Sequence, residues 1–355
     1  MKRRSFLATG AATGLGVLAA PSLLRAQMAP LRVGTYGGYF QDSFDEHIFP
    51  DFTEATGIEV ESIGTPTGEA WLVQLQQAAR AGQAPADVSM MAQVARIRGE
   101  RAGLWAALDP DAVPNRENLP AHFVHEYDDG TFYGTGAVSW YITLVTNTDV
   151  YPEPPTSWRV LWDEENRDRL GLLALASNSF LLEITATTHF GGTDILGTEE
   201  GVMEVLEKVA ELRPNVRLWY RDEGQFQQAL ETGEIPMGQY YHDVTGLAAA
   251  DGQPVRSTFP EEGAVLDSGS WVVSSASGAL DQAQQFIDYM ARPDVQAKLA
   301  RFVGTAPTVD RALTDLTDEE FAAVASDQEP ILPYYDLYVD RADWVNQQWA
   351  EMITG

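Results

Sequence analysis

The sequence predicts a mixed α/β protein whose chain passes more than once between two domains. Three observations support this fold class. Strand-like and helix-like patterns alternate over the first hundred residues. A run dense in β-branched and aromatic residues at 138–147 suits a strand that passes between two domains. A second strand-like run at 263–273 suits the return crossing, and 355 residues is a length typical of about two domains.

The first hundred residues of the chain predict one wound α/β unit. The patterns predict, in order, a strand at 31–36, a glycine turn at 37–38, a helix at 42–56, a strand at 58–63, a helix at 71–81, a strand at 86–91 and a helix at 94–102. Strand, turn, helix and strand in this order form a βαβ unit, so a parallel sheet is expected here.

The second half of the chain alternates less regularly. Between and after the two crossing strands, the patterns predict a buried strand at 172–175, helices at 180–190 and 199–212, a strand at 235–241, and helices at 280–292 and 295–302. The aromatic residues between Tyr334 and Trp349 have roughly helical spacing, which predicts a docked amphipathic helix at the end of the chain.

The composition excludes several classes of protein. The chain has 52 Asp and Glu residues, 23 Lys and Arg residues and no Cys, and its formal net charge is −29. Such a chain is not a basic nucleic-acid binder, a disulfide-stapled mini-protein or a Cys-ligated metal protein. Net charge bears on solubility more than on fold, so the acidity indicates chiefly a solvated surface.

The first 26 residues have the pattern of an export signal. Lys2, Arg3 and Arg4 precede a glycine-rich apolar stretch that ends at Ala26. Two adjacent arginines are typical of a twin-arginine signal, so we expect export to the periplasm and cleavage after Ala26; an ordinary export signal with two arginines is the alternative. Removal of residues 1–26 would take away four basic residues and no acid, which leaves a formal charge of −33.

Sequence motifs of catalysis are absent. The chain has no GxSxG elbow, no GxxxxGK[ST] phosphate loop, no HExxH and no Cys nucleophile. No nucleophile and base stand at a recognisable spacing. We therefore expect a protein that is not an enzyme, and a secreted α/β enzyme is the disfavoured alternative.

The first glycine turn is a candidate ligand site. Tyr36, Gly37 and Gly38 lie where the first strand ends and a helix begins. Exposed helix N–H groups at the carboxyl edge of a parallel sheet commonly face a ligand. The third glycine of a dinucleotide fingerprint is missing, and a turn without a ligand is the alternative.

A second candidate lies at the end of the strand at 235–241. Tyr240, Tyr241, His242 and Asp243 form the densest polar and aromatic cluster of the chain. Two phenols and an imidazole could bind ferric iron, or the tyrosine faces could hold an ammonium group with Asp243 as its counter-charge. Because neighbours in a strand alternate faces, one tyrosine must point into a core. Core packing of the whole cluster is the remaining alternative.

A third candidate lies on the return crossing. Asp267 and Trp271 place a carboxylate and an indole near glycine and serine residues. A carboxylate beside an indole in a cleft between domains would suit a cation. An Asx-turn is the competing interpretation of Asp267.

The order of these motifs resembles that of periplasmic solute-binding proteins of the spermidine/putrescine type. The resemblance extends over about 300 residues and rests on the segments Tyr36-Gly37-Gly38, Phe49-Pro50-Asp51-Phe52-Thr53-Glu54-Ala55-Thr56-Gly57, Ala86-Asp87-Val88, Thr146-Asn147-Thr148, Pro155-Thr156-Ser157-Trp158, Pro260-Glu261-Glu262-Gly263 and Arg292-Pro293-Asp294-Val295. No single segment is specific, but their order and spacing together indicate the family.

The resemblance implies a type II periplasmic binding protein fold, with a ligand enclosed between two lobes. It implies delivery of that ligand to the permease and ATPase of an ABC importer in the inner membrane. It also implies ligand contacts from Tyr36 and Gly37 and from Tyr240 or Tyr241. The boundaries expected for the lobes are 27–137 plus 269–306 for lobe 1 and 138–268 plus 307–355 for lobe 2.

Two departures from the family pattern bear on the ligand. Polyamine binders of this family place acids after the strand that matches 172–175, where this chain has Ser177 and Asn178. They also place an aromatic residue and an aspartate at the return crossing, where Asp267 is displaced and Trp271 comes later. A dication needs an acid at each end to offset its desolvation, so these departures weaken a polyamine assignment.

The sequence thus predicts a monomeric binding protein for a small organic cation, polyamine-like, with no cofactor. Its predicted ligand-binding residues are Tyr36, Gly37, Gly38, Trp140, Tyr141, Asn178, Tyr240, Tyr241, Asp243, Asp267 and Trp271. One alternative is ferric iron bound by Tyr240, Tyr241 and His242. The other is a neutral or anionic organic solute, since Ser177 and Asn178 suit hydroxyl or carboxyl groups.

Overall fold

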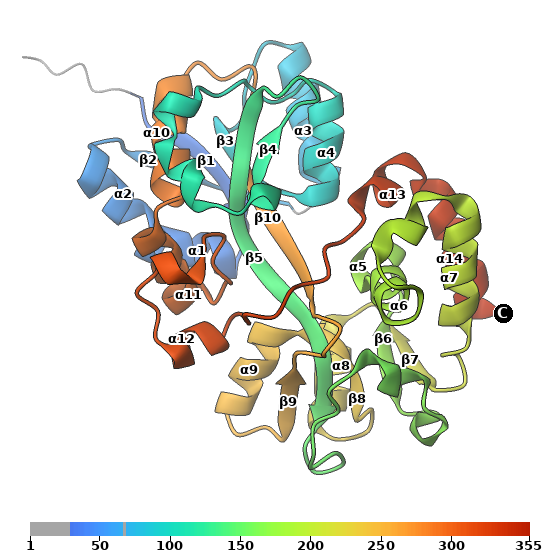
Figure 1. The fold of residues 1–355 in the computed structure, drawn as a ribbon. Coiled ribbons are helices and arrows are strands. Elements are labelled where there is room, and N and C mark those ends of the chain that lie inside the picture. The colour runs from blue at the N-terminus through green and yellow to red at the C-terminus, as the bar shows by residue number, and fades with distance from the viewer. Residues whose placement is uncertain (1–28, 67–68) are drawn as a thin grey trace, which may run out of the picture.

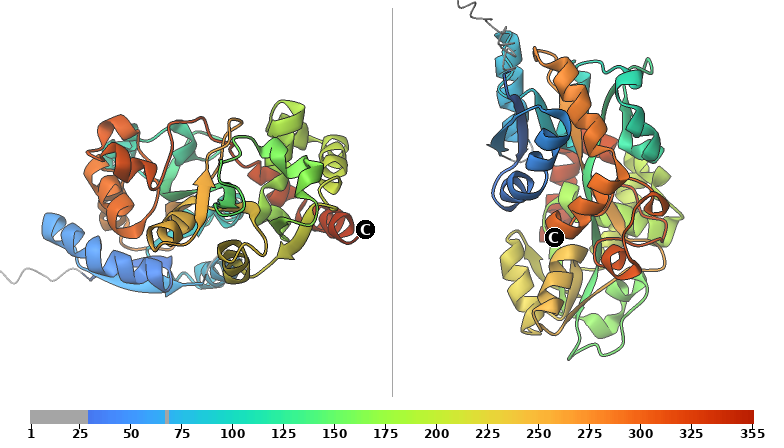
Figure 2. Two further views of the ribbon diagram at one scale, coloured as in Figure 1. Left: turned by 90° about the horizontal axis from the view of Figure 1, so that it is seen from below. Right: turned by 90° about the vertical axis from the view of Figure 1, so that its left-hand side faces the viewer.

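The computed structural model describes residues 29–66 and 69–355 of the chain. The predicted export signal at 1–26 lies outside these residues. Two lobes are stacked one above the other in Figure 1, and long strands run from one into the other. Helices lie on both faces of the sheet in each lobe (Figure 2). The predicted α/β fold with two lobes is confirmed.

One ten-stranded sheet runs through the described part of the molecule. Its strand order is β2-β1-β3-β10-β5-β8-β6-β7, and β4 and β9 both pair with β5. The strands are β1 (Leu31–Tyr36), β2 (Val60–Thr65), β3 (Val88–Ala92), β4 (Val124–Glu126), β5 (Phe132–Asn147), β6 (Leu170–Leu173), β7 (Val216–Tyr220), β8 (Met237–Tyr241), β9 (Val255–Thr258) and β10 (Val265–Val273).

The helices cover this sheet and fill the two ends of the molecule. The α-helices are α1 (Tyr39–His47), α2 (Phe49–Thr56), α3 (Glu69–Arg80), α4 (Gln93–Arg101), α5 (Ala176–Ser179), α6 (Leu181–Phe190), α7 (Glu199–Ala210), α8 (Glu223–Glu231), α9 (His242–Ala250), α10 (Leu280–Met290), α11 (Pro293–Val303), α12 (Asp318–Ala322), α13 (Tyr335–Asp340) and α14 (Ala342–Thr354). Short 3-10 helices are Pro110–Ala112, Pro114–Asn118, Ala121–Phe123, Trp158–Trp162, Glu164–Asn166, Thr193–Gly197 and Arg311–Leu313.

Lobe 1 consists of β1–β4, α1–α4, α10 and α11. Strand β1 pairs in parallel with β2 and β3, and β10 adds an antiparallel partner to β3. The core of the lobe is aromatic, because Trp271 packs edge-on against Phe44 and Phe286. The helix predicted at 42–56 is in fact two helices, since the chain turns at Ile48 before Pro50 occupies the first turn of α2.

Lobe 2 consists of β6–β9, α5–α9, α13 and α14. Strand β6 pairs in parallel with β7 and β8, and β8 pairs antiparallel with β5. The terminal helix α14 docks on this lobe, where the indole of Trp349 donates a hydrogen bond to the Ala174 carbonyl at 3.0 Å. The predicted amphipathic end of the chain is therefore docked, but as two helices, α13 and α14, rather than one.

Two paired strands and one further segment connect the lobes. Strands β5 and β10 pair antiparallel from Ile142↔Val265 to Gly134↔Val272, with a shift in register between Gly269 and Ser270. The pairing requires glycine at position 134, because a Cβ there would lie 2.6 Å from the Trp271 carbonyl oxygen. The predicted crossing strands are thus confirmed, and the first begins at Phe132, earlier than predicted.

The third connection between the lobes is made by the C-terminal part of the chain. Ile331 donates a backbone hydrogen bond to Ala264 at 2.8 Å and accepts one from Leu266 at 3.0 Å. The segment after α12 therefore lies along β10 before it enters α13 (Figure 1). The lobe boundaries given above stay predictions, since β5 and β10 continue through both lobes.

Candidate ligand-binding site

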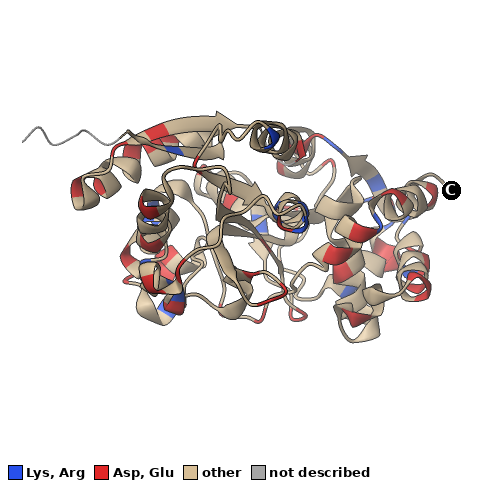
Figure 3. Cartoon of the chain, turned by 90° about the horizontal axis from the view of Figure 1, so that it is seen from above, with Lys and Arg blue, Asp and Glu red and all other residues tan. Residues whose placement is uncertain are grey.

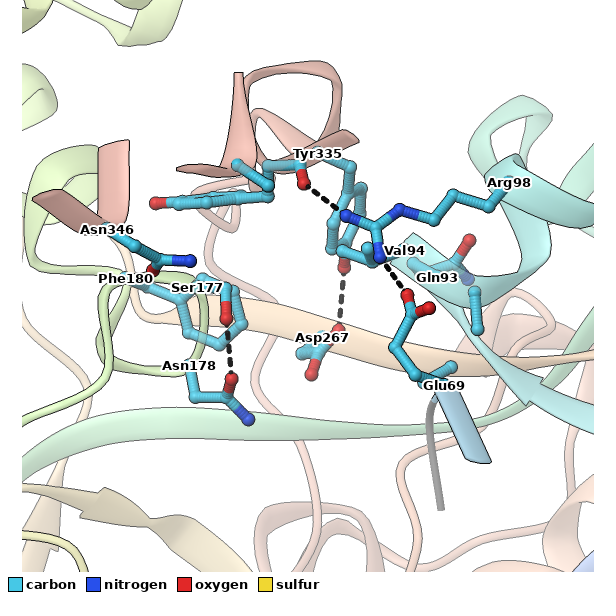
Figure 4. Close-up of a pocket in the computed structure, with 14 residues that line it drawn as sticks. Glu69, Gln93, Val94, Arg98, Ser177, Asn178, Phe180, Asp267, Tyr335 and Asn346 are labelled. Carbon is cyan, nitrogen blue, oxygen red and sulfur yellow. Dashed lines mark hydrogen bonds and ion pairs between the residues drawn. The ribbon is translucent and has the colours of Figure 1, made fainter. Parts of the chain in front are cut away.

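A cavity of about 300 Å³ lies between the lobes (Figure 4). Lobe 1 lines it through α3 and the start of α4, and lobe 2 through α5, α13 and α14. Its described lining residues are Glu69, Ala92, Gln93, Val94, Ala95, Arg98, Ser177, Asn178, Phe180, Asp267, Tyr335, Tyr338, Ala342 and Asn346. Both lobes and a crossing strand thus contribute side chains to one partly open cavity, as a site between lobes requires.

Asp267 is the charged group on the crossing strand. Its carboxylate Oδ1 accepts hydrogen bonds from the Tyr335 hydroxyl at 2.7 Å and from the Ser268 backbone at 2.8 Å. Burial raises the pKa of Asp267 to about 6, and these two hydrogen bonds act in the opposite direction. Among the described residues, no basic side chain forms an ion pair with it. The carboxylate is therefore half-buried beside the cavity and, among the described residues, has no cation as a partner.

A second acid, Glu183, lies behind the cavity on α6. Its side chain is fully buried and accepts hydrogen bonds from the Tyr334 backbone at 3.1 Å and the Tyr338 hydroxyl at 3.0 Å. Burial raises the pKa of Glu183 to about 7, the hydrogen bonds oppose this shift, and the charge of Asp267 adds to it. This part of the molecule thus holds two acids and, in the described residues, no basic partner for either.

The cavity wall in lobe 2 contains a strained residue. Phe180 joins α5 to α6 with φ 51° and ψ 19°, in the left-handed region that residues with a side chain rarely occupy. Such a conformation costs on the order of 1–2 kcal/mol, and residues of this kind gather at binding and catalytic sites. The turn places Ser177 and Asn178 at the cavity, where the serine hydroxyl donates to the asparagine Oδ1 at 2.8 Å.

Two predicted aromatic residues lie next to Asp267. Trp140 is its partner in the β5–β10 register and packs against the cores of both lobes. The Tyr36 hydroxyl is buried, has no hydrogen-bond partner within the described ranges and lies against Gly269. Burial raises the pKa of Tyr36, and the charge of Asp267 adds to this. Neither side chain lines the 300 Å³ cavity, so their predicted contact with a ligand stays a prediction.

The glycine turn shapes the backbone before α1 but does not line the cavity. Gly38 has φ 70° and precedes α1, and Gly37 donates a backbone hydrogen bond to Thr65 at 3.2 Å. No side chain in the described part of the chain caps the helix at this end. Neither glycine lines the 300 Å³ cavity, so their predicted ligand contact stays a prediction.

The remaining predicted side chains lie away from this cavity. Tyr141 is on the opposite face of β5 from Trp140 and packs edge-on against Phe259, with 5.1 Å between ring centroids. Tyr241 donates to the Glu223 carboxylate at 2.9 Å. Asp243 lies in the first turn of α9, where burial raises its pKa. None of the three lines the cavity.

Tyr240 packs in the core of lobe 2. Its ring lies 5.6 Å from that of Phe226 and 6.4 Å from that of Tyr220, both measured between centroids. Its side chain is 4% exposed, so little surface is left for a ligand. The prediction that one of the adjacent tyrosines must point into a core is met by this residue.

The structure corrects the prediction that Trp271 contacts the ligand. Its side chain is 0% exposed and packs between Phe44 and Phe286 in the core of lobe 1. Trp271 follows Asp267 by four residues, so it lies about 13 Å further along β10, beyond the cleft. At the position of Trp271, helices α1 and α10 cover this face of β10.

We therefore expect Trp271→Phe to affect stability and not binding. Loss of part of a buried indole should lower the free energy of unfolding by about 1–3 kcal/mol. The Kd of the folded variant for its ligand should stay within about twofold of the wild-type value. Urea denaturation and calorimetry check the two quantities, and a selective loss of affinity would contradict this placement.

The imidazole of His242, the third predicted iron ligand, has hydrogen-bond partners of its own. The Nδ1 of His242 lies 2.8 Å from the Ser257 hydroxyl, and its Nε2 lies 2.9 Å from the Ala322 carbonyl. Both ring nitrogens thus have partners away from the hydroxyls of Tyr240 and Tyr241. Among the residues that the structure describes, no group of three His, Cys, Asp or Glu side chains could hold a metal ion. These contacts give no support to the ferric-iron alternative, which stays a prediction.

Sequence reasoning missed the contribution of the C-terminal segment. The aromatic spacing predicts only a docked helix for Tyr335, yet its hydroxyl donates a hydrogen bond to Asp267, 68 residues earlier in the chain. Gln93, Arg98 and Asn346 carry no local motif that would have indicated a site. The one available signal was Glu183, an acid inside the otherwise apolar run Leu181-Leu182-Glu183-Ile184.

Two lobes joined by crossing strands, with a polar and aromatic cavity between them, define a protein that encloses a small solute. The family model of bacterial extracellular solute-binding proteins matches residues 47–327. The chain belongs to this family. The family predicted from the order of the motifs is thereby confirmed.

Three comparisons illustrate the relationship. The gamma-aminobutyric acid-binding protein of Pseudomonas aeruginosa is 25% identical over 297 residues, which cover 82% of this chain and 80% of that protein. The spermidine/putrescine-binding periplasmic protein of Escherichia coli is 25% identical over 308 residues, which cover 86% and 83%. The crystal structure of an ABC transporter substrate-binding protein from Bradyrhizobium japonicum has a TM-score of 0.76 at 20% identity and covers 92% and 100%. Across the described ranges, no helix is both long and apolar enough to cross a membrane.

Proposed function

We propose that this protein is the periplasmic solute-binding component of an ABC importer and that it captures a small organic amine by closure of the two lobes. The observation that carries this proposal is the half-buried carboxylate of Asp267, which lines the cavity between the lobes and has no basic partner among the described residues. Membership of the solute-binding family supports the capture role. Relatives named for binding gamma-aminobutyric acid and polyamines support an amine ligand.

An ammonium group supplies what Asp267 lacks. A buried charge is costly unless it has a hydrogen-bonded partner of opposite sign, and the ligand's ammonium would be that partner. Trp140 and Tyr36 would contact the methylene groups and stabilise the positive charge through their ring faces. The Tyr335 hydroxyl already donates to this carboxylate, so an ammonium would extend or replace that hydrogen bond.

The other end of the cavity favours a polar tail over a second ammonium group. Ser177, Asn178 and Asn346 present hydroxyl and amide groups, and the only guanidinium lining the described cavity is that of Arg98. Arg98 is paired with Glu69 at the rim (Figure 4). We therefore favour a ligand with one ammonium and a polar or carboxylate tail, such as an ω-amino acid, over a linear diamine.

The surface charge does not select the ligand. Asp and Glu residues are spread over helices of both lobes (Figure 3), as expected of a solvated acidic coat. We also propose that residues 1–26 form the twin-arginine signal that directs the protein to the periplasm. Delivery to the permease and ATPase of the importer, by a monomer, completes this proposal.

A thermal-shift screen tests the proposed ligand class. The screen compares 4-aminobutyrate, putrescine and spermidine with butyrate and glutarate, which lack an ammonium group. A ligand at about 100 times its Kd stabilises the folded state by about 2.7 kcal/mol, which raises the melting temperature by several degrees. We expect such a shift from the amines alone, and a shift from butyrate or glutarate without one from any amine would overturn the proposal.

A further inference from the structure

Helix α13 belongs to lobe 2 but reaches lobe 1. Leu337 and Tyr338 pack in the hydrophobic core of lobe 2. Glu183 of α6 fixes the start of the helix, since it accepts hydrogen bonds from the Tyr334 backbone and the Tyr338 hydroxyl. In Figure 1 α13 lies beside α4 of lobe 1, and the two helices contact each other. The helix is thus anchored in one lobe and packed against the other.

Two arginines of α4 hold α13 from the side of lobe 1. Arg101 pairs with Asp336 at 3.0 Å and also with Asp340, at the two ends of the helix. Arg98 donates to the Tyr338 carbonyl at 3.1 Å. These contacts join side chains of one lobe to a helix of the other, so they exist only while the lobes are closed at this edge.

The same helix reaches the ligand site. Its first residue, Tyr335, donates a hydrogen bond to Asp267 at 2.7 Å. A shift of α13 would therefore move the group that holds the proposed ammonium-binding carboxylate. The positions of Arg101 and Asp267 are connected through one short helix of six residues.

We propose that Arg101 is a positioning residue for ligand capture: by pairing with Asp336 and Asp340 it latches α13 onto α4, keeps the lobes closed and holds Tyr335 against Asp267. The effect on ligand affinity rests on the proposed function, whereas the latch itself does not. Closure held in this way reduces the free energy that a ligand must supply to populate the closed form.

The ion pairs that form the latch are individually weak, because their side chains are exposed to solvent. The Arg101 side chain is 44% exposed and its acids are 61% and 52% exposed, so each pair is partly screened by solvent. Charge reversal does more than remove the attraction, because it places a third carboxylate beside two others. We expect Arg101→Glu to weaken ligand binding by about three- to tenfold, mainly through faster dissociation.

The chain offers a matched control and a clean labelling scheme. Arg217 is also 44% exposed and pairs with Glu234, 64% exposed, but both lie within lobe 2. Because the chain has no Cys, Gln285→Cys on α10 and Gln228→Cys on α8 give one spin label in each lobe. Double electron-electron resonance then reports the distance between the lobes without any ligand.

The experiment compares Arg101→Glu, Arg217→Glu and the triple variant Arg101→Glu with Asp336→Arg and Asp340→Arg. We expect longer label distances for Arg101→Glu, wild-type distances for Arg217→Glu, and a return of the short distances in the triple variant. Calorimetry with 4-aminobutyrate and putrescine should show the three- to tenfold loss only in the first variant. Arg101→Gln provides a milder variant if the reversal disturbs folding.

The outcomes separate the latch from the proposed function. Wild-type label distances and affinity in Arg101→Glu, with amines still bound, would overturn the latch and leave the proposed function standing. A change in distance that the triple variant reverses, in a protein that binds no amine, would establish the latch and overturn the proposed ligand. Equal losses in Arg101→Glu and Arg217→Glu would show a general effect of charge and overturn the specific role of Arg101.

Discussion

Asp267→Asn is expected to remove most of the affinity for amine ligands. The substitution keeps the shape of the side chain but leaves the ammonium group without its counter-charge in the cavity. Loss of one partner from a buried, hydrogen-bonded charge pair costs about 2–5 kcal/mol, which corresponds to a loss of roughly 30-fold or more. Calorimetric titration with the amine that gives the largest thermal shift measures this loss.

Asp243→Asn is the matched control for this experiment. Asp243 is also a partly buried acid with a raised pKa and was predicted from the sequence to face the ligand. It does not line the cavity, so its replacement should change Kd by less than about threefold. If the two variants lose affinity equally, the cavity around Asp267 is not the ammonium site.

Glu183→Gln is expected to change how stability depends on pH. The pKa of Glu183 is raised to about 7 from an ordinary 4.5, so the folded state favours its protonated form. The stability that this contributes is fully present below pH 4.5 and is lost as the pH rises through 7. Between pH 5 and pH 8, wild-type stability should therefore fall relative to the variant by roughly 2–3 kcal/mol.

Urea denaturation of both proteins at pH 5 and pH 8 measures this difference. Glu320→Gln is the control of opposite sign, because Arg301 lowers the pKa of Glu320 to about 2. The stability from that acid is present above pH 4.5 and is lost only as the pH falls towards 2. The difference in the free energy of unfolding between wild type and Glu320→Gln should therefore be the same at pH 5 and at pH 8. A parallel dependence for wild type and Glu183→Gln would show that Glu183 does not titrate in this range.

Local patterns predicted much of the fold. The second part of β5 could be recognised because residues 138–147 are rich in β-branched and aromatic side chains, whereas its start at Phe132 was not predicted. The turn at Gly37-Gly38 and the return strand β10 were also evident, because glycine and strand alternation act over a few neighbouring residues. The break at Ile48 was missed because helical periodicity continues across it.

The site was less predictable, because its contacts are made between distant residues. Asp267 and Asn178 were named from the sequence and line the cavity, and Tyr36 and Trp140 lie beside Asp267. The hydrogen bond from Tyr335 joins segments that only the third crossing of the chain brings together. Trp271 was misassigned because sequence shows which face of a strand a residue occupies but not how deep in the lobe it lies.

The order in which the chain passes through the two lobes also determines when each lobe can fold during translation. Lobe 1 needs β10, which inserts between β3 and β5 only after the whole of β6–β9 has been made. Until then β3, which includes Met90 and Met91, has an open edge, and unpaired edges of this kind invite association with other chains. Neither lobe is a contiguous piece of the gene, so fragments that end before Val265 should aggregate, and the two lobes should unfold as one cooperative unit.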